Sequence, residues 1–317
     1  MNHRCKGLGG WMTALVTPFR DGRIDESAFV FLCERQIERG CSGLVVCGTT
    51  GEAPTLNPRE QAQIIRLAVE TARGRVPVVA GVGSNCTATS VDQVYQAEWL
   101  GADALLCVVP YYNRPSQDGM FRHFLTVQSK TGLPVLLYDV PSRTGAALDV
   151  DTIVRLADLP HIVGIKDASG DLSRLSVLRR KLGPDFLLLS GDDATAPAAL
   201  ELGCRGCISV SANVVPALCA SMHRSWVEGD PVRFRFLRDL LAPLAVGLFL
   251  ESNPIPVKWA LARLGLIEDD LRLPLTPLAG QFEAPLRDAL DRIVFHEAEE
   301  ARRAPYPTST LPSATAA

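Results

Sequence analysis

The sequence predicts an α/β protein, a closed (β/α)8 TIM barrel with a C-terminal helical extension. Eight short apolar runs, each typical of a buried strand, recur along the chain. They alternate with helical patterns of about ten to fifteen residues, the rhythm of strand–helix units around a parallel sheet. Several helical patterns end at a glycine, as helices commonly do. Strand–helix units repeated around one sheet favour closure into a barrel.

The elements follow from local patterns. The strands are expected at 12–16, 43–46, 76–80, 104–109, 134–138, 162–166, 186–190 and 206–210. The helices between them are expected at 26–39, 59–73, 90–100, 119–131, 149–157, 172–182 and 194–202. A doubly wound sheet is the alternative, but no G-x-G-x-x-G follows the first strand. Gly81-Val82-Gly83 lacks the third glycine of that fingerprint and is interpreted as a tight strand-to-helix turn.

The chain stays helical after the eighth strand, at 231–250, 256–264 and 279–302. These segments exceed what a barrel needs, so they are expected to form an appendage or an oligomer contact. We therefore expect a catalytic barrel over 1–230 and a helical region over 231–303. The remainder, 304–317, is rich in Pro, Ser, Thr and Ala and is expected to be disordered.

Composition excludes several classes of protein. The 317 residues carry a formal net charge of −3 without a Lys/Arg run, which argues against nucleic-acid binding. No apolar stretch approaches the roughly 18 residues of a membrane span, and the start lacks a secretory apolar segment. The odd count of nine cysteines disfavours a disulfide framework. A cytoplasmic location is expected.

Metal and redox motifs are weak. Cys204 and Cys207 form a C-x-x-C, but no second pair or histidine pair lies nearby, which favours a structural role. The five histidines fall in no metal or triad spacing. The adjacent Asp192 and Asp193 are interpreted as a helix N-cap rather than a metal site. We expect no metal or organic cofactor.

Lys166 is the most informative residue. It ends the apolar run Ile162-Val163-Gly164-Ile165, so its amine should project from a dry wall. Desolvation disfavours the ammonium form, and a neutral amine is what imine formation with a carbonyl requires. Of the five lysines only Lys166 stands at a strand end, whereas Lys258 follows a rigid Asn-Pro-Ile-Pro loop. The alternative for Lys166 is an ion pair with Asp167 or another carboxylate.

Other chemically useful residues also follow strands, where barrel active sites gather. Gly48-Thr49-Thr50-Gly51-Glu52 offers backbone N–H groups and hydroxyls to an anion, with a well-made turn as the alternative. Tyr138 ends the strand before that of Lys166 and can serve as acid and base on a carbinolamine. Arg143 suits a carboxylate, with a salt bridge to Asp139 or Glu52 as the alternative.

The chain resembles the 4-hydroxy-tetrahydrodipicolinate synthases, also called dihydrodipicolinate synthases, within the class I pyruvate-aldolase superfamily. The resemblance extends from Gly10 to Val294. The motifs that carry it are Thr49-Thr50-Gly51-Glu52, Tyr111 through Ser116, Tyr138 through Gly145, Gly164-Ile165-Lys166, Ser190-Gly191-Asp192-Asp193 and Asn253 through Lys258.

The resemblance implies a role for each catalytic residue. Lys166 forms a Schiff base with pyruvate, and Tyr138 donates and accepts protons. Thr49 links Tyr138 to Tyr112, which reaches in from a neighbouring subunit.

The resemblance also implies how the substrates bind. Thr50 and its loop amides hold the pyruvate carboxylate, Ile208 lines the other side, and Gly191 belongs to the same set. Arg143 binds the carboxylate of aspartate 4-semialdehyde. The implied assembly is a homotetramer, a dimer of dimers, without a cofactor.

Two functional alternatives stay open at this stage. N-acetylneuraminate lyase and the 2-keto-3-deoxy sugar acid aldolases share the lysine and the tyrosine, and Arg143 is the discriminator because it suits a short acid. A keto-acid sensor without catalysis is more distant.

The resemblance carries one departure, at the lysine feedback site of bacterial members. Its histidine and glutamate positions hold Pro58, Gln61 and Thr89, whereas Asn85 and Tyr111 match. The missing acid removes a charge-assisted bond of about 1.5–3 kcal/mol. Weak or absent inhibition by lysine is therefore expected.

Overall fold

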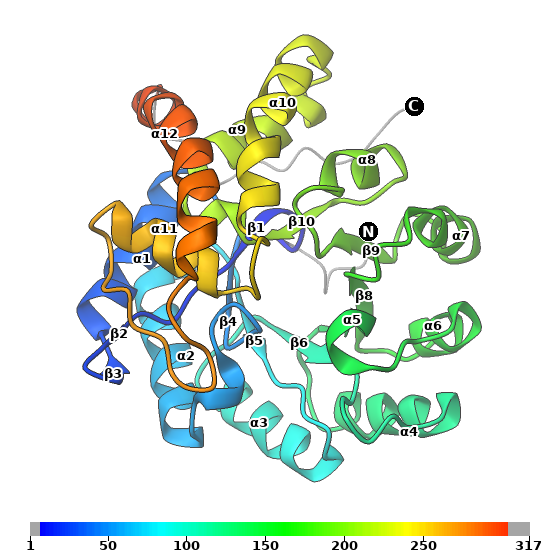
Figure 1. Ribbon diagram of the computed structural model, residues 1–317. Coiled ribbons are helices and arrows are strands. Elements are labelled where there is room, and N and C mark those ends of the chain that lie inside the picture. The colour runs from blue at the N-terminus through cyan, green and yellow to red at the C-terminus, as the bar shows by residue number, and fades with distance from the viewer. Residues whose placement is uncertain (1–6, 304–317) are drawn as a thin grey trace.

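The computed structural model describes residues 7–303 and shows a closed barrel of parallel strands ringed by helices (Figure 1). β1 pairs with both β4 and β10, which closes the sheet and excludes a doubly wound arrangement. The predicted barrel is confirmed. Its strands are β1 Gly10–Ala14, β4 Leu44–Val46, β5 Val78–Gly81, β6 Ala104–Val108, β7 Val135–Asp139, β8 Ile162–Asp167, β9 Leu187–Ser190 and β10 Gly206–Ser209.

The helices that follow the strands cover the outside of the barrel. Asp25 accepts a hydrogen bond from the Ala28 N–H and so caps α1, while Asn57 and Glu60 form a reciprocal capping box at α2. These are local signals, and the expected ranges agree with the structure to within three residues at either end. The helices are α1 Glu26–Glu38, α2 Pro58–Ala72, α3 Thr87–Trp99, α4 Gln117–Gln128, α6 Val150–Ala157, α7 Leu172–Leu182, α8 Ala196–Glu201 and α9 Pro216–Val227.

The sequence did not predict the shorter elements or α9. The short hairpin lies between β1 and α1, and the single turns follow β4, β7 and β10. Each spans too few residues to show a period. They are β2 Phe19–Arg20, β3 Arg23–Ile24, η2 Ala53–Thr55, α5 Pro141–Thr144 and η3 Ser211–Asn213.

Strand alternation divides the core into two layers. Residues such as Met12, Val45, Leu106 and Leu189 face inward and fill the barrel, where they form one apolar cluster. Their neighbours face outward and pack under the helices in a larger cluster. The barrel is therefore a packed core rather than a pore, and a polar side chain on its inner face near a strand's end is surrounded by hydrocarbon.

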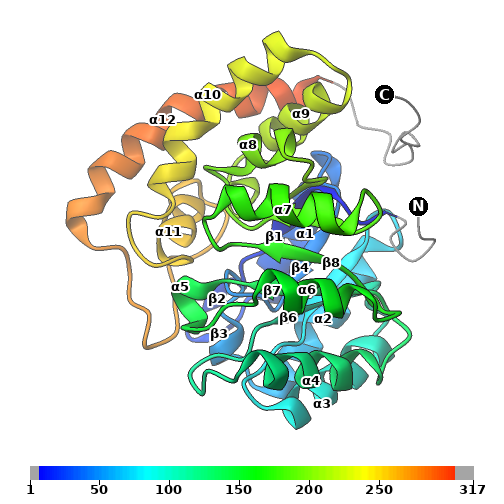
Figure 2. The same cartoon turned by 90° about the vertical axis from the view of Figure 1, so that its right-hand side faces the viewer.

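Three helices complete the described chain: α10 Pro231–Gly247, α11 Ile255–Arg263 and α12 Gly280–Arg302. Helices α10 and α12 pack against each other and against α9. Figure 2 shows α11 on the side of the barrel where α5 follows β7, the carboxyl end of the strands. Lys258 lies inside α11, in agreement with the helix expected at 256–264; Pro254 and Pro256 stand at the start of this helix, where proline is tolerated.

Some expectations concern the chain as a whole. The expected disordered segment 304–317 lies outside the described residues. Within residues 7–303, no helix has the length and apolarity needed to span a membrane. The cysteines of that range are free thiols, and burial raises the pKa of Cys41, Cys47 and Cys107 to about 12, which keeps them protonated and inert.

A buried carboxylate fastens α12 to the barrel. The Glu297 side chain accepts from the N–H groups of Ala217 and Leu218 at 3.2 and 3.0 Å, at the start of α9, and from Arg39 at 2.7 Å. Burial raises the pKa of Glu297, and these donors oppose the rise. The negative charge sits where the unpaired N–H groups of α9 gather.

Removing this carboxylate should weaken the whole fold. Glu297→Ala is expected to lower the free energy of unfolding by about 3 kcal/mol, because it leaves Arg39 and two buried N–H groups without their acceptor. Urea unfolding measures the change. Glu299→Ala, at a side chain 45% exposed, is the control and should cost under about 0.5 kcal/mol. Equal losses in the two variants would contradict this role for Glu297.

Candidate active site

Lys166 and Tyr138 lie side by side at the carboxyl ends of β8 and β7. The parallel register pairs them directly, and alternation turns both side chains toward the barrel interior. Each is only 6% exposed, and the Lys166 Nζ lies 4.2 Å from the centre of the Tyr138 ring. The predicted placement of Lys166 at a buried strand end is confirmed. Its alternative partner, Asp167, faces outward and pairs with Arg174 instead.

Gly191 gives the Lys166 side chain its room. A Cβ at Gly191 would lie 3.1 Å from the Lys166 Cε and 2.7 Å from the Ala168 Cβ, closer than side chains pack. The Gly191 N–H also donates to the Asp167 carbonyl at 2.7 Å, which ties the end of β9 to β8. The structure therefore places Gly191 against the lysine, as a wall that only a glycine provides.

The turn after β4 presents hydroxyls to the same site. The Thr49 Oγ1 lies 3.4 Å from the Tyr138 hydroxyl. The Gly51 N–H donates to the Gly48 carbonyl and the Glu52 N–H to the Thr49 carbonyl, at 3.2 and 3.1 Å. The motif is therefore a well-made turn, and it brings a hydroxyl to Tyr138; its role in binding an anion stays a prediction. Thr50 is buried in the turn and accepts a hydrogen bond from the Asn253 Nδ2 at 3.0 Å.

Arg143 stands at the rim, in the one-turn helix α5. Its Nη2 donates to the Asn253 carbonyl at 3.0 Å. The alternative salt bridges are wrong, because Asp139 pairs with Arg174 and Glu52 pairs with Lys258. The Arg143 guanidinium thus lies at the surface of the cleft without an ion pair to Asp139 or Glu52.

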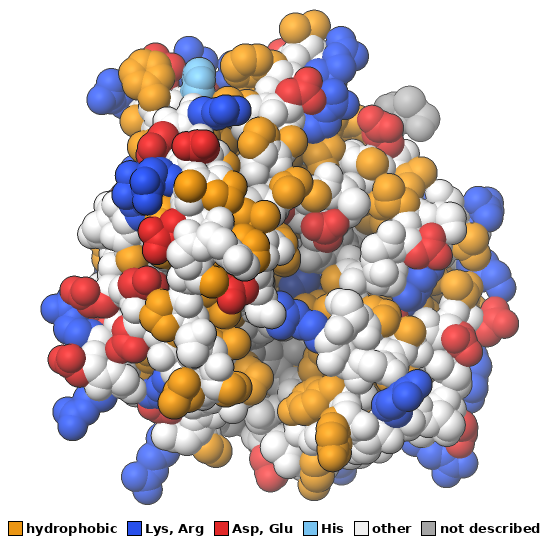
Figure 3. All heavy atoms as spheres, viewed as in Figure 1, with side chains coloured by type: hydrophobic (Ala, Val, Ile, Leu, Met, Phe, Trp, Pro, Cys, Tyr) orange, Lys and Arg blue, Asp and Glu red, His pale blue; other side chains and the backbone are white. Residues whose placement is uncertain are grey.

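A cleft of about 500 Å³ opens above these groups. Thr49, Tyr138 and Arg143 line it, together with Tyr111 and Asn253. Figure 3 shows this face of the molecule hollowed near its centre, with basic side chains there. Lys166 and Ile208 do not line the cleft but lie buried at the strand ends of β8 and β10, and the half-buried Gly191 follows β9. The arrangement suits a small acid that passes a cationic rim and reaches an amine at the floor.

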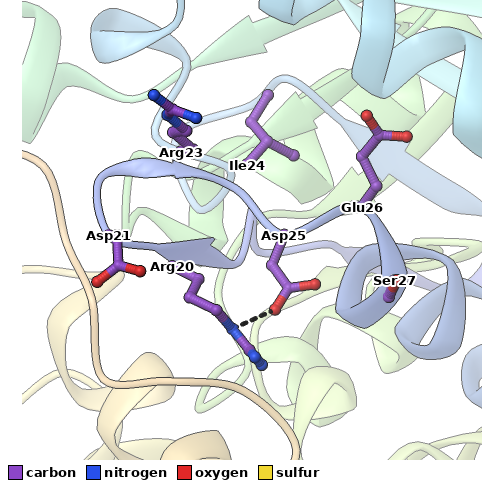
Figure 4. Close-up of a pocket in the computed structure, with 7 residues that line it drawn as sticks. All are labelled: Arg20, Asp21, Arg23, Ile24, Asp25, Glu26 and Ser27. Atoms are coloured by element: carbon purple, nitrogen blue, oxygen red, sulfur yellow. Dashed lines mark ion pairs between the residues drawn. The ribbon is translucent and has the colours of Figure 1, made fainter.

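A second hollow, of about 770 Å³, lies beside the β2–β3 hairpin (Figure 4). One continuous stretch, Arg20–Asp21 and Arg23 to Ser27, lines it, and Arg20 pairs with Asp25 at 3.0 Å. Side chains from separate elements do not converge there, so it lacks the features of a catalytic site.

Comparison with known proteins agrees with this geometry. Residues 7–293 match the model of the dihydrodipicolinate synthetase family. The chain belongs to this family. A 4-hydroxy-tetrahydrodipicolinate synthase of Methylobacterium radiotolerans is 48% identical over 283 residues, which cover 89% of this chain and 95% of that protein. One from Rhizobium meliloti is 47% identical over 282 residues, covering 89% and 97%.

Solved structures of the dihydrodipicolinate synthetase family share the fold. The 4-hydroxy-tetrahydrodipicolinate synthase of Methylacidiphilum fumariolicum superposes with a TM-score of 0.90 at 43% identity, over 93% of this chain and 98% of that one. The chloride-inhibited dihydrodipicolinate synthase of Acinetobacter baumannii, complexed with pyruvate, gives 0.88 at 44% identity, over 90% and 98%.

Tyr112, the remaining catalytic residue expected from the family resemblance, stands apart from the site. It is 89% exposed and has a φ of +71°, and its N–H approaches the Thr144 carbonyl at 3.4 Å. Within residues 7–303 no hydrogen bond joins it to Thr49 or Tyr138. Its predicted role depends on a neighbouring subunit and stays a prediction.

A buried ionic clamp, which the sequence analysis missed, lies behind the catalytic strand ends. Asp139 follows Tyr138 on β7, and Asp167 follows Lys166 on β8. Both aspartates face outward and stand opposite each other in the strand register. Arg174 of α7 reaches both, at 2.7 and 3.4 Å. Burial raises the pKa of Asp139, and Arg174 opposes the rise. The sequence carries a signal for this clamp, because an aspartate directly follows each of the inward-facing residues Tyr138 and Lys166.

The adjacent aspartates after β9 do not cap a helix. Helix α8 begins at Ala196 with Thr195 at its N-cap and no side-chain bond, so the N-cap interpretation is wrong. The buried Asp193 carboxylate accepts instead from the Ser209 Oγ and the Val210 and Ser211 N–H groups, at 2.5, 2.7 and 3.0 Å. It ties the β9 and β10 loops together. In the described part of the chain, no three His, Cys, Asp or Glu side chains are arranged for a metal.

Arg174→Met should destabilise the fold by about 3–5 kcal/mol at neutral pH, because two buried carboxylates lose their cation. Without Arg174 the folded-state pKa of Asp139 rises further above its unfolded value. The folded state then binds more protons, so the deficit narrows as pH falls toward about 4.

Urea unfolding across pH measures this effect of Arg174. Arg122→Met, at an ion pair with 77% and 60% exposed side chains, is the control and should change stability by under about 0.5 kcal/mol. A deficit that stays constant from neutral to acidic pH would refute the clamp.

Proposed function

We propose that this protein condenses pyruvate with L-aspartate 4-semialdehyde to 4-hydroxy-tetrahydrodipicolinate, a step toward diaminopimelate and lysine. The observation that carries the proposal is Lys166, an amine buried in the barrel interior against the Tyr138 ring. The family match and the names of the relatives support it. Those names do not favour the alternative, a sugar-acid aldolase.

The chemistry follows from a desolvated amine. In the proposed first step the free amine of Lys166 attacks the pyruvate carbonyl carbon, and loss of water leaves an imine. The imine withdraws electrons, so a methyl proton leaves and an enamine forms. The enamine carbon attacks the aldehyde of the second substrate. That substrate's own amine then attacks the imine carbon, which closes the ring and releases Lys166. Bond making and breaking balance without a metal or organic cofactor.

The surrounding groups handle the protons and the carboxylates. The Tyr138 hydroxyl, beside Thr49 at 3.4 Å, is positioned to carry protons to and from the carbinolamine oxygen. Thr50 and the amides of its turn hold the pyruvate carboxylate, with Ile208 and Gly191 on the other side. Arg143 at the rim takes the carboxylate of the semialdehyde.

The proposal includes an assembly and a location. Tyr112 is 89% exposed on the loop after β6, and Trp99 at the end of α3 is 82% exposed. Large exposed aromatics are typical of protein interfaces. We propose a homo-oligomer, a tetramer built as a dimer of dimers, in which Tyr112 completes the site of a neighbour. A cytoplasmic location is part of the same proposal.

Weak feedback by lysine is the final part. Gln61 and Thr89 line the far end of the cleft, where the Gln93 Nε2 donates to the Gln61 Oε1 at 3.3 Å. The dihydrodipicolinate synthase of Cyanidioschyzon merolae has been solved with lysine bound. In this chain the wall of the cleft offers the Gln61 and Gln93 amides and the Thr89 hydroxyl, with Pro58 at the start of α2.

Borohydride trapping tests the function. Incubation with pyruvate and borohydride should add reduced pyruvate to Lys166, located by peptide mapping. Aspartate semialdehyde should compete with trapping and yield product, whereas N-acetylneuraminate should not turn over. Lys166→Ala should abolish the adduct, and Lys181→Ala, at a side chain 48% exposed, should retain it. An adduct on another lysine, or none in the native protein, would rule the proposal out.

Lysine inhibition tests the feedback proposal. The native enzyme should keep its activity at micromolar lysine. Thr89→Glu should restore a carboxylate for an ammonium group, a contact of about 1.5–3 kcal/mol, and lower the inhibition constant about tenfold or more. Thr89→Gln is the uncharged control. A micromolar inhibition constant in the native enzyme would count against weak feedback.

A further inference from the structure

The turn that carries Thr49 and Thr50 is fixed from the C-terminal region. Glu52, at its end, has a φ of +53°, which is uncommon for a residue with a side chain. Its carboxylate is completely buried. One oxygen accepts from the Lys258 Nζ at 2.5 Å and the other from the Arg272 N–H at 3.2 Å. Both donors follow residue 250, about two hundred positions along the chain.

Lys258 is held as firmly as Glu52. It is fully buried in α11, donates to the Asp270 carbonyl at 2.7 Å and lies 4.3 Å from the centre of the Phe19 ring. Burial lowers the pKa of Lys258, and the nearby Glu52 opposes the fall. The Lys258 Nζ therefore donates its hydrogen bonds to protein acceptors, and its burial keeps it out of contact with substrate.

A second contact from the same region spans the site. The Asn253 Nδ2 donates to the Thr50 Oγ1, and the Asn253 carbonyl accepts from Arg143, both at 3.0 Å. Asn253 precedes α11 and thus contacts both Thr50 and Arg143. These are the two residues to which the proposed function assigns the substrate carboxylates. Within residues 7–303 the buried Asn253 Oδ1 has no hydrogen-bond partner.

Stability alone is a weak explanation for a buried ion pair, because a well-packed apolar pair of similar volume is often as stable. What an ion pair supplies is direction: the carboxylate must meet its donors at set angles. Here the ion pair fixes the orientation of Glu52, whose own N–H donates to the Thr49 carbonyl at 3.1 Å. A shift of Glu52 is therefore a shift of the turn that faces Tyr138.

We propose that Lys258 and Glu52 form a positioning pair that sets the Thr49–Thr50 turn for the pyruvate carboxylate and the proton relay. This inference rests on the proposed function. It makes the C-terminal helices part of the catalytic unit and assigns a role in the reaction to two residues that never contact substrate.

The test compares Glu52→Gln, Lys258→Met and the double variant. Each single variant should lower kcat/KM for pyruvate about 100-fold, the effect of a misplaced site, and slow imine trapping on Lys166. The KM for aspartate semialdehyde should change less, because Asn253 still holds Arg143. The double variant leaves no buried charge unpaired, so it should regain stability in urea without regaining kcat/KM.

The outcomes separate positioning from structural support. Arg233→Met, at the Arg233–Glu300 pair on α10 and α12, is the matched control and should lose stability while keeping the native KM for pyruvate. Recovery of kcat/KM together with stability in the double variant would overturn the inference, as would native kinetics in Glu52→Gln, the variant that best keeps the shape of the site. Failure of the native enzyme to form any pyruvate imine would instead overturn the proposed function.

Discussion

The proposed function depends on a buried lysine that forms no ion pair within residues 7–303. Lys166 is buried in the apolar interior of the barrel, and its nearest described partner is the face of the Tyr138 ring. The surroundings of this amine are an aromatic ring and hydrocarbon. The barrel supplies that environment because inward-facing Leu106, Leu136 and Leu189 pack around the strand ends. Hydrocarbon packing thereby gives the amine the apolar surroundings that the proposed function requires.

Lys258 is a second buried lysine of this chain, and its partners differ from those of Lys166. It is more deeply buried than Lys166, yet it meets the Glu52 carboxylate and a backbone carbonyl. The two lysines share burial and differ in partners, so burial alone does not distinguish the proposed nucleophile from a lysine held by protein acceptors. The distinguishing fact is where the carboxylates go: Asp139 and Asp167 face away from the lysine of β8 and are taken by Arg174.

The sequence predicted what local pattern determines. The barrel follows from the spacing of apolar runs, and Lys166 and Tyr138 follow from the rule that barrel chemistry gathers at strand ends. The pairings of Glu52, Arg174 and Asp193 were missed because each joins side chains on different elements, and the periodicity within one element does not report such contacts.

The boundary expected near residue 230 separates parts that the interactions join. Asn253, Lys258 and Arg272 all bond to the turn after β4 or to its neighbours, while Glu297 accepts from the start of α9. A helical appendage that merely filled the surface would contact helices only. This one reaches the strand ends at the catalytic mouth and the helix starts beside them. Because barrel loops are the parts of the fold free to vary, a rigid site needs restraint from outside the barrel. In this chain α11 and the residues that flank it provide this restraint, so the catalytic unit of the proposed function extends at least to Arg272.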